Sequence, residues 1–465
     1  MKMNKAVQRS IPYIAFVMLF SITGLYRCIA ASGGGSSPGG GVANVSQNVL
    51  LLSDIHFNPY AECSDNVLPC PTLQNLIKNP IEKWPVFLSQ TPINNYGEET
   101  NNAFLTQGFN NLKDIAASRN VKIVLITGDL LAHDFDKKYY NFTTGQSQSD
   151  LTNFSSKTLI YVLQELRKRL SADSKIYLVL GNNDNDLGNY AMQSEAFLKS
   201  VGTYLSGFID NNNDKANFMA SFSKGGYFSV PLSNNISLIG VNTNPLSSTR
   251  PNKSVAMEQL AWFRNELVNA RNNNKKIILA QHIPYGIDTF YTAAQKTVIP
   301  VLNFDLQAGY LELLKQYSSI ITTVYAGHLH TEFFSLPYTA IPLIGTIAFN
   351  SYYNNNPGFK IVNISSAGYF NGYTTYYSTL RNGSTLAWKP LYDYRAVYGN
   401  PAQIAATLNN FPYDINAAKA ISYRQYYSGM VPSASSISDN TKWKYYYCGI
   451  KFVESIAYAK CLKRY

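Results

Sequence analysis

The chain has 465 residues, which is enough for one large domain or two ordinary ones, and 46% of them are hydrophobic, so a large core can be buried. Charged residues make up only 14%, and the formal net charge of +11 is not gathered into a Lys/Arg run, which argues against a nucleic-acid-binding protein. This mild basic bias is compatible with an anionic substrate and equally with a generic basic surface.

The N-terminal segment has the pattern of a secretion signal. Three basic residues, Lys2, Lys5 and Arg9, precede an uncharged apolar stretch at 10–26, and small residues follow it. This order predicts a cleaved signal peptide over 1–31 and therefore a secreted protein, extracellular or periplasmic. An uncleaved membrane anchor is the alternative, but the apolar stretch is at the short limit for a span. We therefore expect no stable membrane insertion after cleavage.

After the signal, the chain divides into three predicted parts. Residues 32–45 are rich in Gly and Ser and are expected to form a flexible linker. Between 46 and 385, apolar runs alternate with amphipathic helical patterns, which predicts an α/β domain whose sheet is covered by helices on both faces. Residues 386–465 are predicted to be a helical C-terminal extension packed on that domain. Strands are predicted at 49–53, 121–127, 175–180, 236–241, 276–280, 320–326 and 342–347, and helices at 102–118, 157–171, 192–203, 257–273, 306–317, 401–409 and 440–460.

The cysteines indicate an oxidising compartment. Of the five, Cys28 lies in the signal region, and the others form two sequence-local pairs, Cys63/Cys70 and Cys448/Cys461. In a secreted protein these pairs are expected to be disulfides, with free thiols as the alternative. Four cysteines allow three connectivities, so the local pairing is a hypothesis.

The histidines are the most informative residues. There are only five, and each lies at or just beyond the C-terminal end of a predicted strand. In open α/β sheets, ligands bind outside those strand ends, so this placement predicts a functional site there. The strand ends read, in chain order, Asp54-Ile55-His56, Gly128-Asp129 followed by His133-Asp134, Gly181-Asn182-Asn183-Asp184, Gln281-His282 and Gly327-His328-Leu329-His330.

The residue types at these strand ends suit a transition-metal site. In an extended segment, residues i and i+2 point to the same side, so Asp54 with His56 and His328 with His330 form two pairs that can each grip a cation. The neighbouring Gly residues let the backbone turn sharply and bring ligands close. Imidazoles, carboxylates and an amide oxygen together suit Zn, Mn or Fe rather than a structural Cys site.

These ordered blocks resemble the D-x-H, GD, GNH-D/E, H and G-H-x-H pattern of the calcineurin-like metallophosphoesterases over residues 48–331. The resemblance implies an α/β fold, a four-layer β-sandwich flanked by helices, with two divalent cations, zinc first and manganese or iron as alternatives. It assigns Asp54, His56, Asp129 and His330 to one cation, and Asp129, Asn182, His282 and His328 to the other. Asp129 would bridge them, because cations about 3.5–4 Å apart need a shared anionic ligand.

Further segments resemble the acid sphingomyelinase and sphingomyelinase-like phosphodiesterase branch. They are 128–134, the Cys63/Cys70 pair, 241–244, 356–359 and the Cys-tied tail. Acid sphingomyelinase itself carries a Cys-rich saposin domain before its catalytic domain, whereas here a Gly/Ser linker leads directly to the first predicted strand. This difference favours the sphingomyelinase-like branch, which implies soluble nucleotide-type or phosphocholine-type substrates.

One position departs from the family pattern. The third block usually reads Gly-Asn-His, with its His facing the scissile phosphate, but this chain has Asn183 there. An amide can donate a hydrogen bond to phosphate but cannot protonate a leaving alkoxide. His133 matches a branch His placed near the leaving group, so we weigh a general-acid role for it against substrate contact or structural support. Asp134 or Asp184 could orient a ligand imidazole, with loop capping as the more common alternative.

Together these inferences predict a secreted di-metal phosphodiesterase that hydrolyses a phosphodiester or phosphoanhydride bond of a small-molecule phosphate ester. A metal-bridging hydroxide is expected to attack in line with the leaving oxygen, which His133 or bulk water would protonate, while Asn183 stabilises charge on a phosphoryl oxygen. We expect a monomer with no nucleic-acid polymer as partner. The alternatives are a sphingomyelin phosphodiesterase, a phosphomonoesterase or nucleotidase, and a catalytically weakened ligand-binding homologue.

Overall fold

The computed structural model describes residues 46–465 except 90–91, 336–340, 381–384 and 432–435, so the predicted signal peptide (1–31) and linker (32–45) lie outside the described residues. The strands are β1 (Gln47–Leu52), β2 (Ile123–Ile126), β3 (Lys175–Leu178), β4 (Phe228–Ser233), β5 (Ile236–Val241), β6 (Lys276–Gln281), β7 (Ile321–Ala326), β8 (Phe334–Ser335), β9 (Leu343–Gly345), β10 (Gly358–Ile364), β11 (Phe370–Tyr377) and β12 (Lys389–Asp393). The helices are α1 (Pro71–Lys78), α2 (Trp84–Phe87), α3 (Asn102–Ser118), α4 (Phe135–Phe142), α5 (Gln148–Arg167), α6 (Glu195–Ser206), α7 (Asn212–Gly225), α8 (Lys253–Asn272), α9 (Thr289–Gln295), α10 (Phe304–Gln316), α11 (Tyr394–Tyr398), α12 (Ile404–Asn409), α13 (Ala418–Tyr426), α14 (Trp443–Lys451) and α15 (Ser455–Leu462).

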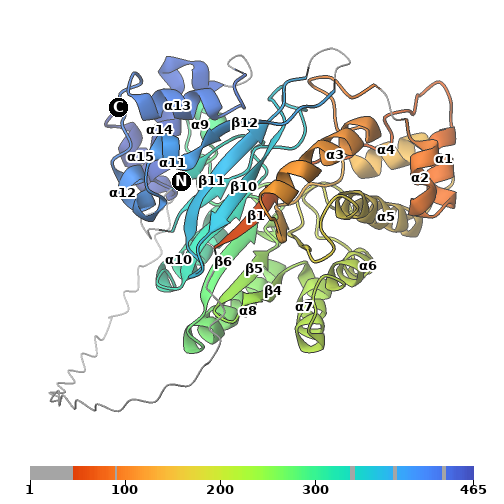
Figure 1. Cartoon of the computed structure of the whole chain (residues 1–465), viewed down its shortest axis with the longest axis horizontal. Helices are drawn as coiled ribbons and strands as arrows, with labels where there is room; N and C mark the ends of the chain where they lie inside the picture. The colour runs from red at the N-terminus through yellow and green to blue at the C-terminus, as the bar shows by residue number, and fades with distance from the viewer. Residues whose placement is uncertain (1–45, 90–91, 336–340, 381–384, 432–435) are drawn as a thin grey trace, which may run out of the picture. The chain divides into compact units, whose positions relative to one another are not determined.

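The strands form two six-stranded mixed sheets (Figure 1). In the first, the order is β12-β11-β10-β1-β2-β3, with β1, β2 and β3 parallel and β10 antiparallel to β1. In the second, the order is β4-β5-β6-β7-β9-β8, with β5, β6, β7 and β9 parallel. Side chains of both sheets belong to one buried core, and Thr322 of β7 donates a hydrogen bond to the Gly368 carbonyl between β10 and β11. The two sheets therefore pack against each other, as the predicted β-sandwich requires.

Side-chain caps mark where the long helices begin. Asn101, Ser194 and Asn252 accept hydrogen bonds from the first-turn backbone of α3, α6 and α8. Ser147 and Asp150 form a reciprocal capping box at the start of α5. In Figure 1, helices α1 to α5 gather at one end of the sheets and α11 to α15 at the other, so the predicted helical cover and helical C-terminal region are both present.

The strands predicted from continuous apolar runs are confirmed, and the missed strands have a different pattern. β2, β5 and β7 are buried throughout, as a doubly covered strand should be. β4 and β12 contain Pro231 and Pro390 and are both edge strands, where a missing N–H is tolerated. β11 is rich in Tyr and Thr and has no continuous apolar run to mark it. The predicted helical extension at 386–465 also contains a strand that the sequence did not indicate, Lys389–Asp393, which pairs with β11.

Two disulfides tie local segments together. Cys63–Cys70 joins the loop after β1 to the start of α1, with 5.4 Å between the Cα atoms. Cys448–Cys461 joins α14 to α15, with 5.9 Å between the Cα atoms. Both predicted local pairings are confirmed, while Cys28 lies outside the described residues. Buried side chains of α13, α14 and α15 belong to the same core as the sheets, so the helical extension packs on the domain.

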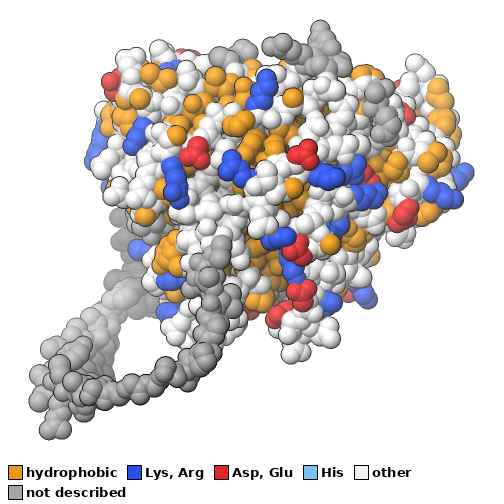
Figure 2. Space-filling view, viewed as in Figure 1, with side chains coloured by type: hydrophobic (Ala, Val, Ile, Leu, Met, Phe, Trp, Pro, Cys, Tyr) orange, Lys and Arg blue, Asp and Glu red, His pale blue; other side chains and the backbone are white. Residues whose placement is uncertain are grey.

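The surface carries its charges in a dispersed way. On the face drawn in Figure 2, Lys and Arg side chains are scattered among neutral and acidic ones rather than joined into a band. That face therefore offers no continuous cationic track for a polyanion. Among the described helices, none combines the length and apolar character needed to cross a lipid bilayer.

Candidate metal centre

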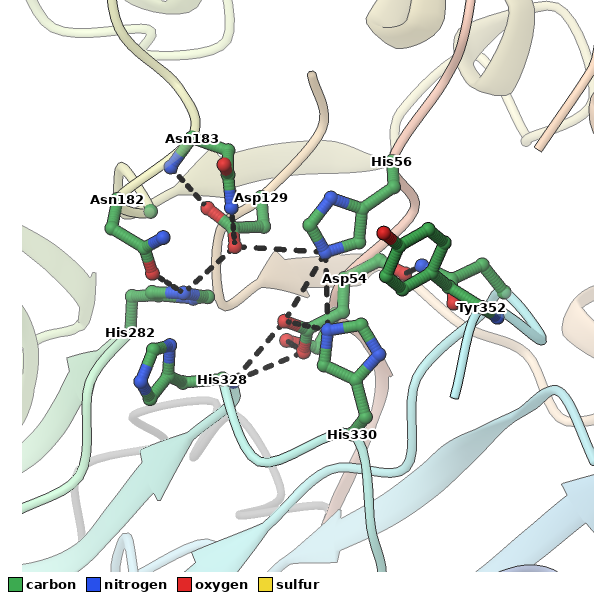
Figure 3. A network of polar contacts seen from close by, with 12 residues as sticks. Asp54, His56, Asp129, Asn182, Asn183, His282, His328, His330 and Tyr352 are labelled. Carbon is green, nitrogen blue, oxygen red and sulfur yellow. Dashed lines mark hydrogen bonds and ion pairs between the residues drawn. The ribbon is translucent and has the colours of Figure 1, made fainter. Parts of the chain in front are cut away.

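The predicted metal-ligating residues meet where parallel strands of both sheets end (Figure 3). Asp54 and His56 follow β1, Asp129 follows β2, Asn182 follows β3, His282 follows β6, and His328 and His330 follow β7. All of them come together, and all except the partly exposed His328 are buried. Because the carboxyl ends of these parallel strands lie at one edge of the sandwich, residues far apart in the chain reach one centre.

Asp129 lies between two groups of ligands. Its Oδ2 atom is 3.2 Å from His282 Nε2 and 3.6 Å from His56 Nε2, which belong to different sheets. The ligand atoms of Asp129, His282 and His328 lie within 4.8 Å of one another. The ligand atoms of Asp54, His56 and Asp129 meet the same limit. One carboxylate thus belongs to two candidate cation sites, which is the arrangement that a di-metal centre needs.

The first group contains two imidazoles that face each other. His56 Nε2 is 3.1 Å from His330 Nε2, and His330 Nε2 is 3.4 Å from Asp54 Oδ1. His56 Nδ1 is 3.0 Å from the Leu131 carbonyl, so this nitrogen donates its proton there and leaves Nε2 with a free lone pair. Two nitrogen lone pairs and a carboxylate oxygen that point at one place repel one another unless a proton or a cation lies between them. These residues therefore fit a divalent cation.

The second group is oriented in the same way. His282 Nδ1 lies 2.6 Å from the Thr127 carbonyl, and His282 Nε2 lies 3.0 Å from Asn182 Oδ1. Asn182 donates its Nδ2 hydrogen bond to Asn189 Oδ1 at 2.8 Å, which turns its own Oδ1 toward the centre. An amide oxygen and an imidazole nitrogen lone pair thus converge beside Asp129, and both are suitable ligands for a borderline transition metal.

The ligand-bearing backbone is not extended, contrary to the prediction from the i, i+2 spacing. Asp54, His56, Asp129, His328 and His330 have φ values of 51°, 47°, 56°, 72° and 59°, all in the left-handed region. Strand alternation therefore does not explain why the paired side chains face one centre. Non-glycine residues in this region cost on the order of 1 kcal/mol or more each, and such strain is concentrated at functional sites.

Two glycines permit the close approach of the ligand loops, as predicted. A Cβ atom at Gly181 would lie 2.0 Å from Asp129 Oδ1. A Cβ atom at Gly327 would lie 2.0 Å from Ser53 Oγ and 2.8 Å from Asp54 Oδ2. No side chain fits in either place without moving a carboxylate.

Burial and mutual charge set the pKa values in the centre. Burial alone would raise the pKa of Asp54, but the nearby His330 and other imidazoles lower it to about 2. Burial alone would lower the pKa of His282, but the Asp129 charge raises it to about 9. Burial lowers the pKa of His328 to about 4 and that of His330 to about 3. At neutral pH these values leave Asp54 ionised and His328 and His330 neutral, which are the protonation states that bind metal. His282 is protonated in the metal-free chain and would lose that proton to a bound cation.

Asn183 holds the central carboxylate. Its Nδ2 donates to Asp129 Oδ2 and its backbone N–H donates to Asp129 Oδ1, each at 2.8 Å. Its own Oδ1 is buried with no hydrogen-bond partner among the described residues. The sequence predicts that the Asn183 amide contacts the phosphate. In the structure the amide contacts Asp129 instead. The amide fixes the orientation of the carboxylate on which both groups depend.

His133 lies beside the centre within a stack of rings. Its imidazole is 4.0 Å from the ring of His56 with 10° between planes, and 4.3 Å from the ring of Tyr352 on its other side. His133 Nδ1 is 3.0 Å from Glu99 Oε1, and Lys138 pairs with the second Glu99 oxygen. The predicted site residue is thus held by neighbours on three sides, with its Nε2 left available for exchange of a proton.

Asp184 supports the backbone rather than an imidazole, which agrees with the loop-capping alternative that the sequence left open for it. Its carboxylate accepts hydrogen bonds from the backbone N–H groups of Asp129, Leu130, Leu131 and Gly181. This carboxylate therefore holds the β2 loop against the β3 loop. Burial and the charge of Asp129 raise its pKa to about 6.

Several residues of the site carry no signal in the sequence. Glu99 lies in a loop between helices, and Tyr352 is one of 35 tyrosines. Asn189 is an exposed residue in an Asn-rich chain. Their roles depend on which loops the two sheets bring together, which no local pattern reveals.

The fold and the site together define a metal-dependent phosphoric ester hydrolase, since buried carboxylates and imidazoles from two packed sheets converge around a shared aspartate. Comparison with known families matches residues 48–332 to the calcineurin-like phosphoesterases. The chain belongs to that family, as the sequence blocks predicted, and its relatives place it in the acid sphingomyelinase-like branch.

Three relatives illustrate the branch. The chain is 21% identical to Sphingomyelin phosphodiesterase B of Dictyostelium discoideum over 90% of this chain and 65% of that protein, just under two thirds of its length. It is 23% identical to Acid sphingomyelinase-like phosphodiesterase 3b of Mus musculus over 88% of this chain and 89% of that protein. It is 20% identical to Cyclic GMP-AMP phosphodiesterase SMPDL3A of Homo sapiens over 76% of this chain and 82% of that protein.

Proposed function

We propose that this chain is a secreted di-metal phosphodiesterase that hydrolyses small nucleotide-type or phosphocholine-type phosphate esters. The single observation that carries the proposal is the place of Asp129, whose Oδ2 lies within 3.6 Å of imidazoles from both sheets. Zinc is the favoured cation, because imidazole, carboxylate and amide ligands suit it, with manganese and iron as alternatives. Asp54, His56 and His330 would complete one site, and Asn182, His282 and His328 the other.

The chemistry divides between the cations and the chain. Bound cations would supply a water of lowered pKa and would neutralise charge on the phosphoryl oxygens. Asn183 keeps the Asp129 carboxylate in the orientation that serves both cation sites. His133, held by Glu99 through Nδ1, would take up a proton at Nε2 from solvent, give it to the leaving oxygen and return to the neutral form. Burial and the neighbouring His56 lower the pKa of His133, so this proton donor is favoured in acid.

Aromatic residues around the centre support the proposed substrate class. Tyr353 is 54% exposed and its ring lies edge-on to His330 at 4.7 Å. The hydroxyl of Tyr190 lies 3.4 Å from His328 Nε2. Exposed ring faces next to a phosphate site can stack on a nucleobase or hold a quaternary ammonium. The names of the relatives, which include sphingomyelin and cyclic GMP-AMP phosphodiesterases, agree with either class.

Secretion is supported by the two disulfides, because such bonds persist in oxidising compartments. The signal peptide over residues 1–31 and the monomeric state remain part of the proposal. N-terminal sequencing of the exported protein and light scattering of the purified chain would test them directly.

A metal count with a substrate panel tests the function. Purified protein should hold two transition-metal ions per chain and hydrolyse bis-p-nitrophenyl phosphate in an EDTA-sensitive way. The panel contains a cyclic dinucleotide, a nucleoside triphosphate, CDP-choline, sphingomyelin in micelles and a phosphomonoester. A preference for sphingomyelin would establish a sphingomyelin phosphodiesterase. A preference for the monoester would establish a phosphomonoesterase or nucleotidase. Full metal loading with no turnover of any ester would show a ligand-binding homologue instead.

A further inference from the structure

A buried ion pair links the two sheets beside the metal centre. Lys360, on β10 of the first sheet, donates a hydrogen bond to the carboxylate of Glu332. Glu332 lies two residues after His330 in the loop that joins β7 to β8 of the second sheet. Lys360 is 0% exposed and Glu332 is 3% exposed. Thr375 of β11 donates to the other carboxylate oxygen, and the Lys360 ammonium lies 4.1 Å from the centre of the Tyr373 ring. Every polar atom of the pair thus has a fixed neighbour.

The segment around this pair is also held by its backbone. The Glu332 N–H donates to the Tyr427 carbonyl, at the end of α13 in the C-terminal extension, at 2.8 Å. The His330 carbonyl accepts a hydrogen bond from the Asn355 side chain at 3.2 Å. The loop that carries His330 is therefore attached to the first sheet, to the β9–β10 connection and to the C-terminal helices.

His330 needs such external support more than the other buried imidazoles of the centre. The Nδ1 atoms of His56 and His282 contact the backbone carbonyls of Leu131 and Thr127, which fix their ring orientations. The Nδ1 atom of His330 is buried and has no hydrogen-bond partner among the described residues. A metal-binding imidazole without such a partner depends on its backbone for its position.

Stability alone is a poor reason for an ion pair in this place. Taking two charges out of water costs about as much as their attraction returns, and well-packed apolar residues are often as stable or more stable. An ion pair differs from apolar packing in that its hydrogen bonds allow only one relative position of the partners. An ion pair is therefore most useful where the relative position of two packed sheets has to be fixed closely.

We propose that Glu332 and Lys360 are positioning residues for His330. They fix the loop after β7 against β10 and so set the distance of His330 Nε2 from Asp54 and His56, which come from the first sheet. The inference rests on the proposed di-metal function, because the position of His330 matters only if it binds a cation.

The test compares metal binding with stability in the full-length protein. The double variant Glu332→Leu/Lys360→Met replaces the pair by apolar side chains, and Asp173→Leu/Lys122→Met does the same for an exposed pair joined at 2.8 Å. Unfolding of the metal-free proteins is followed by calorimetry, and Zn²⁺ affinity by competition with a chromogenic chelator. The absorption spectrum of the Co²⁺-loaded proteins reports the ligand geometry.

We expect the buried double variant to keep the unfolding temperature of the metal-free protein within a few degrees. The Zn²⁺ site that contains His330 should lose affinity by roughly tenfold to a hundredfold, as expected for the loss of residues that orient ligands, and the Co²⁺ spectrum should change. The surface double variant should match the wild type in both measurements. A folded buried variant with wild-type Zn²⁺ affinity would overturn the inference.

If the double variant does not fold, a milder variant tests whether Glu332 and Lys360 position His330. Thr375→Val keeps the ion pair and the side-chain volume but removes the hydroxyl that binds Glu332. It should fold and should weaken Zn²⁺ binding severalfold, whereas unchanged affinity and an unchanged Co²⁺ spectrum would reject the positioning role. Absence of Zn²⁺ binding in the wild type would instead reject the di-metal function itself, so the two failures are distinguishable.

Discussion

The imidazole rings of His56 and His133 lie parallel, with 4.0 Å between their centroids and 10° between their planes. His56 is a candidate metal ligand, and His133 is the residue that we propose as proton donor to the leaving group. Stacking on the His56 ring fixes the distance of the His133 ring from the candidate centre. The hydrogen bond to Glu99 fixes the orientation of the His133 ring within that stack. Ordinary ring packing thus places the proposed acid beside the candidate cation site.

Replacement of His133 should affect substrates according to their leaving groups. His133→Ala removes the proton donor, so hydrolysis of alkyl phosphodiesters should slow by about 10²- to 10⁴-fold, as for a lost general acid. Hydrolysis of bis-p-nitrophenyl phosphate should change little, since nitrophenolate leaves without a proton. Tyr352→Leu is the control, because it removes the neighbouring ring and leaves the donor. Equal losses for both leaving groups in His133→Ala would contradict the assignment.

Asp129→Asn should change the number of bound cations. The amide lacks the negative charge that two cations would share, so metal analysis should show a fall from two ions to one or fewer per chain. Phosphodiester hydrolysis should fall by at least about 10³-fold, since charge stabilisation and the activated water are both lost. Asp173→Asn, at an exposed ion pair, should retain both ions. Full activity of Asp129→Asn would show that this carboxylate does not bridge.

Asn189 should prove important although it is exposed. Its Oδ1 accepts the Asn182 Nδ2 hydrogen bond and thereby directs the Asn182 oxygen inward. Asn189→Leu should weaken binding of one Zn²⁺ roughly tenfold, whereas Asn189→Asp keeps an acceptor and should bind close to wild-type strength. Neither substitution should shift the unfolding temperature of the metal-free protein by more than a few degrees, because the residue is exposed. Equal Zn²⁺ affinities in the two variants would exclude the positioning role.

Glu99 should make stability depend on pH in the acid range. Burial would raise its pKa, but the hydrogen bond from His133 and the charge of Lys138 lower it below the usual 4.5. A carboxyl with a lowered folded-state pKa contributes its full stability above about pH 4.5 and loses it as the pH falls through the folded value. Glu99→Gln should therefore be less stable than the wild type at pH 7, and urea unfolding should show the difference shrinking below pH 4.5. A difference that stays constant from pH 7 to pH 3 would mean that Glu99 is not ionised in the folded protein.

Much of the fold and most of the candidate centre could be predicted from the sequence, because both depend on strong local patterns. Continuous apolar runs such as Ile236–Val241 mark the buried strands, and histidines are rare enough that their positions after those runs are informative. β4 and β12 could not be predicted, because Pro231 and Pro390 are typical of loops until the strands are known to lie at sheet edges.

The side chains that orient the ligands could not be predicted for a different reason. Glu99 and Lys360 contact partners that are distant in the sequence, and a buried lysine is against expectation for a strand. Asn189 contacts a residue only seven positions away, but nothing in an Asn-rich segment distinguishes it. The left-handed backbone at Asp54 and His56 was also missed, since a D-x-H sequence has no glycine to indicate it. Local patterns thus predict which residues gather, but not how each is held.

The separation of the ligands along the chain sets an order of events during maturation. His56 and His330 face each other across 274 positions of sequence, and the loop of His330 is fastened to Tyr427 further on. Contacts of such long range form late, after most of the loop-closure entropy has been overcome. A nascent chain therefore lacks the last cation ligand until His330 has emerged, and it lacks the anchor of that loop until Tyr427 has emerged. Cation capture would then act as a checkpoint on complete folding, and truncated chains should be released empty.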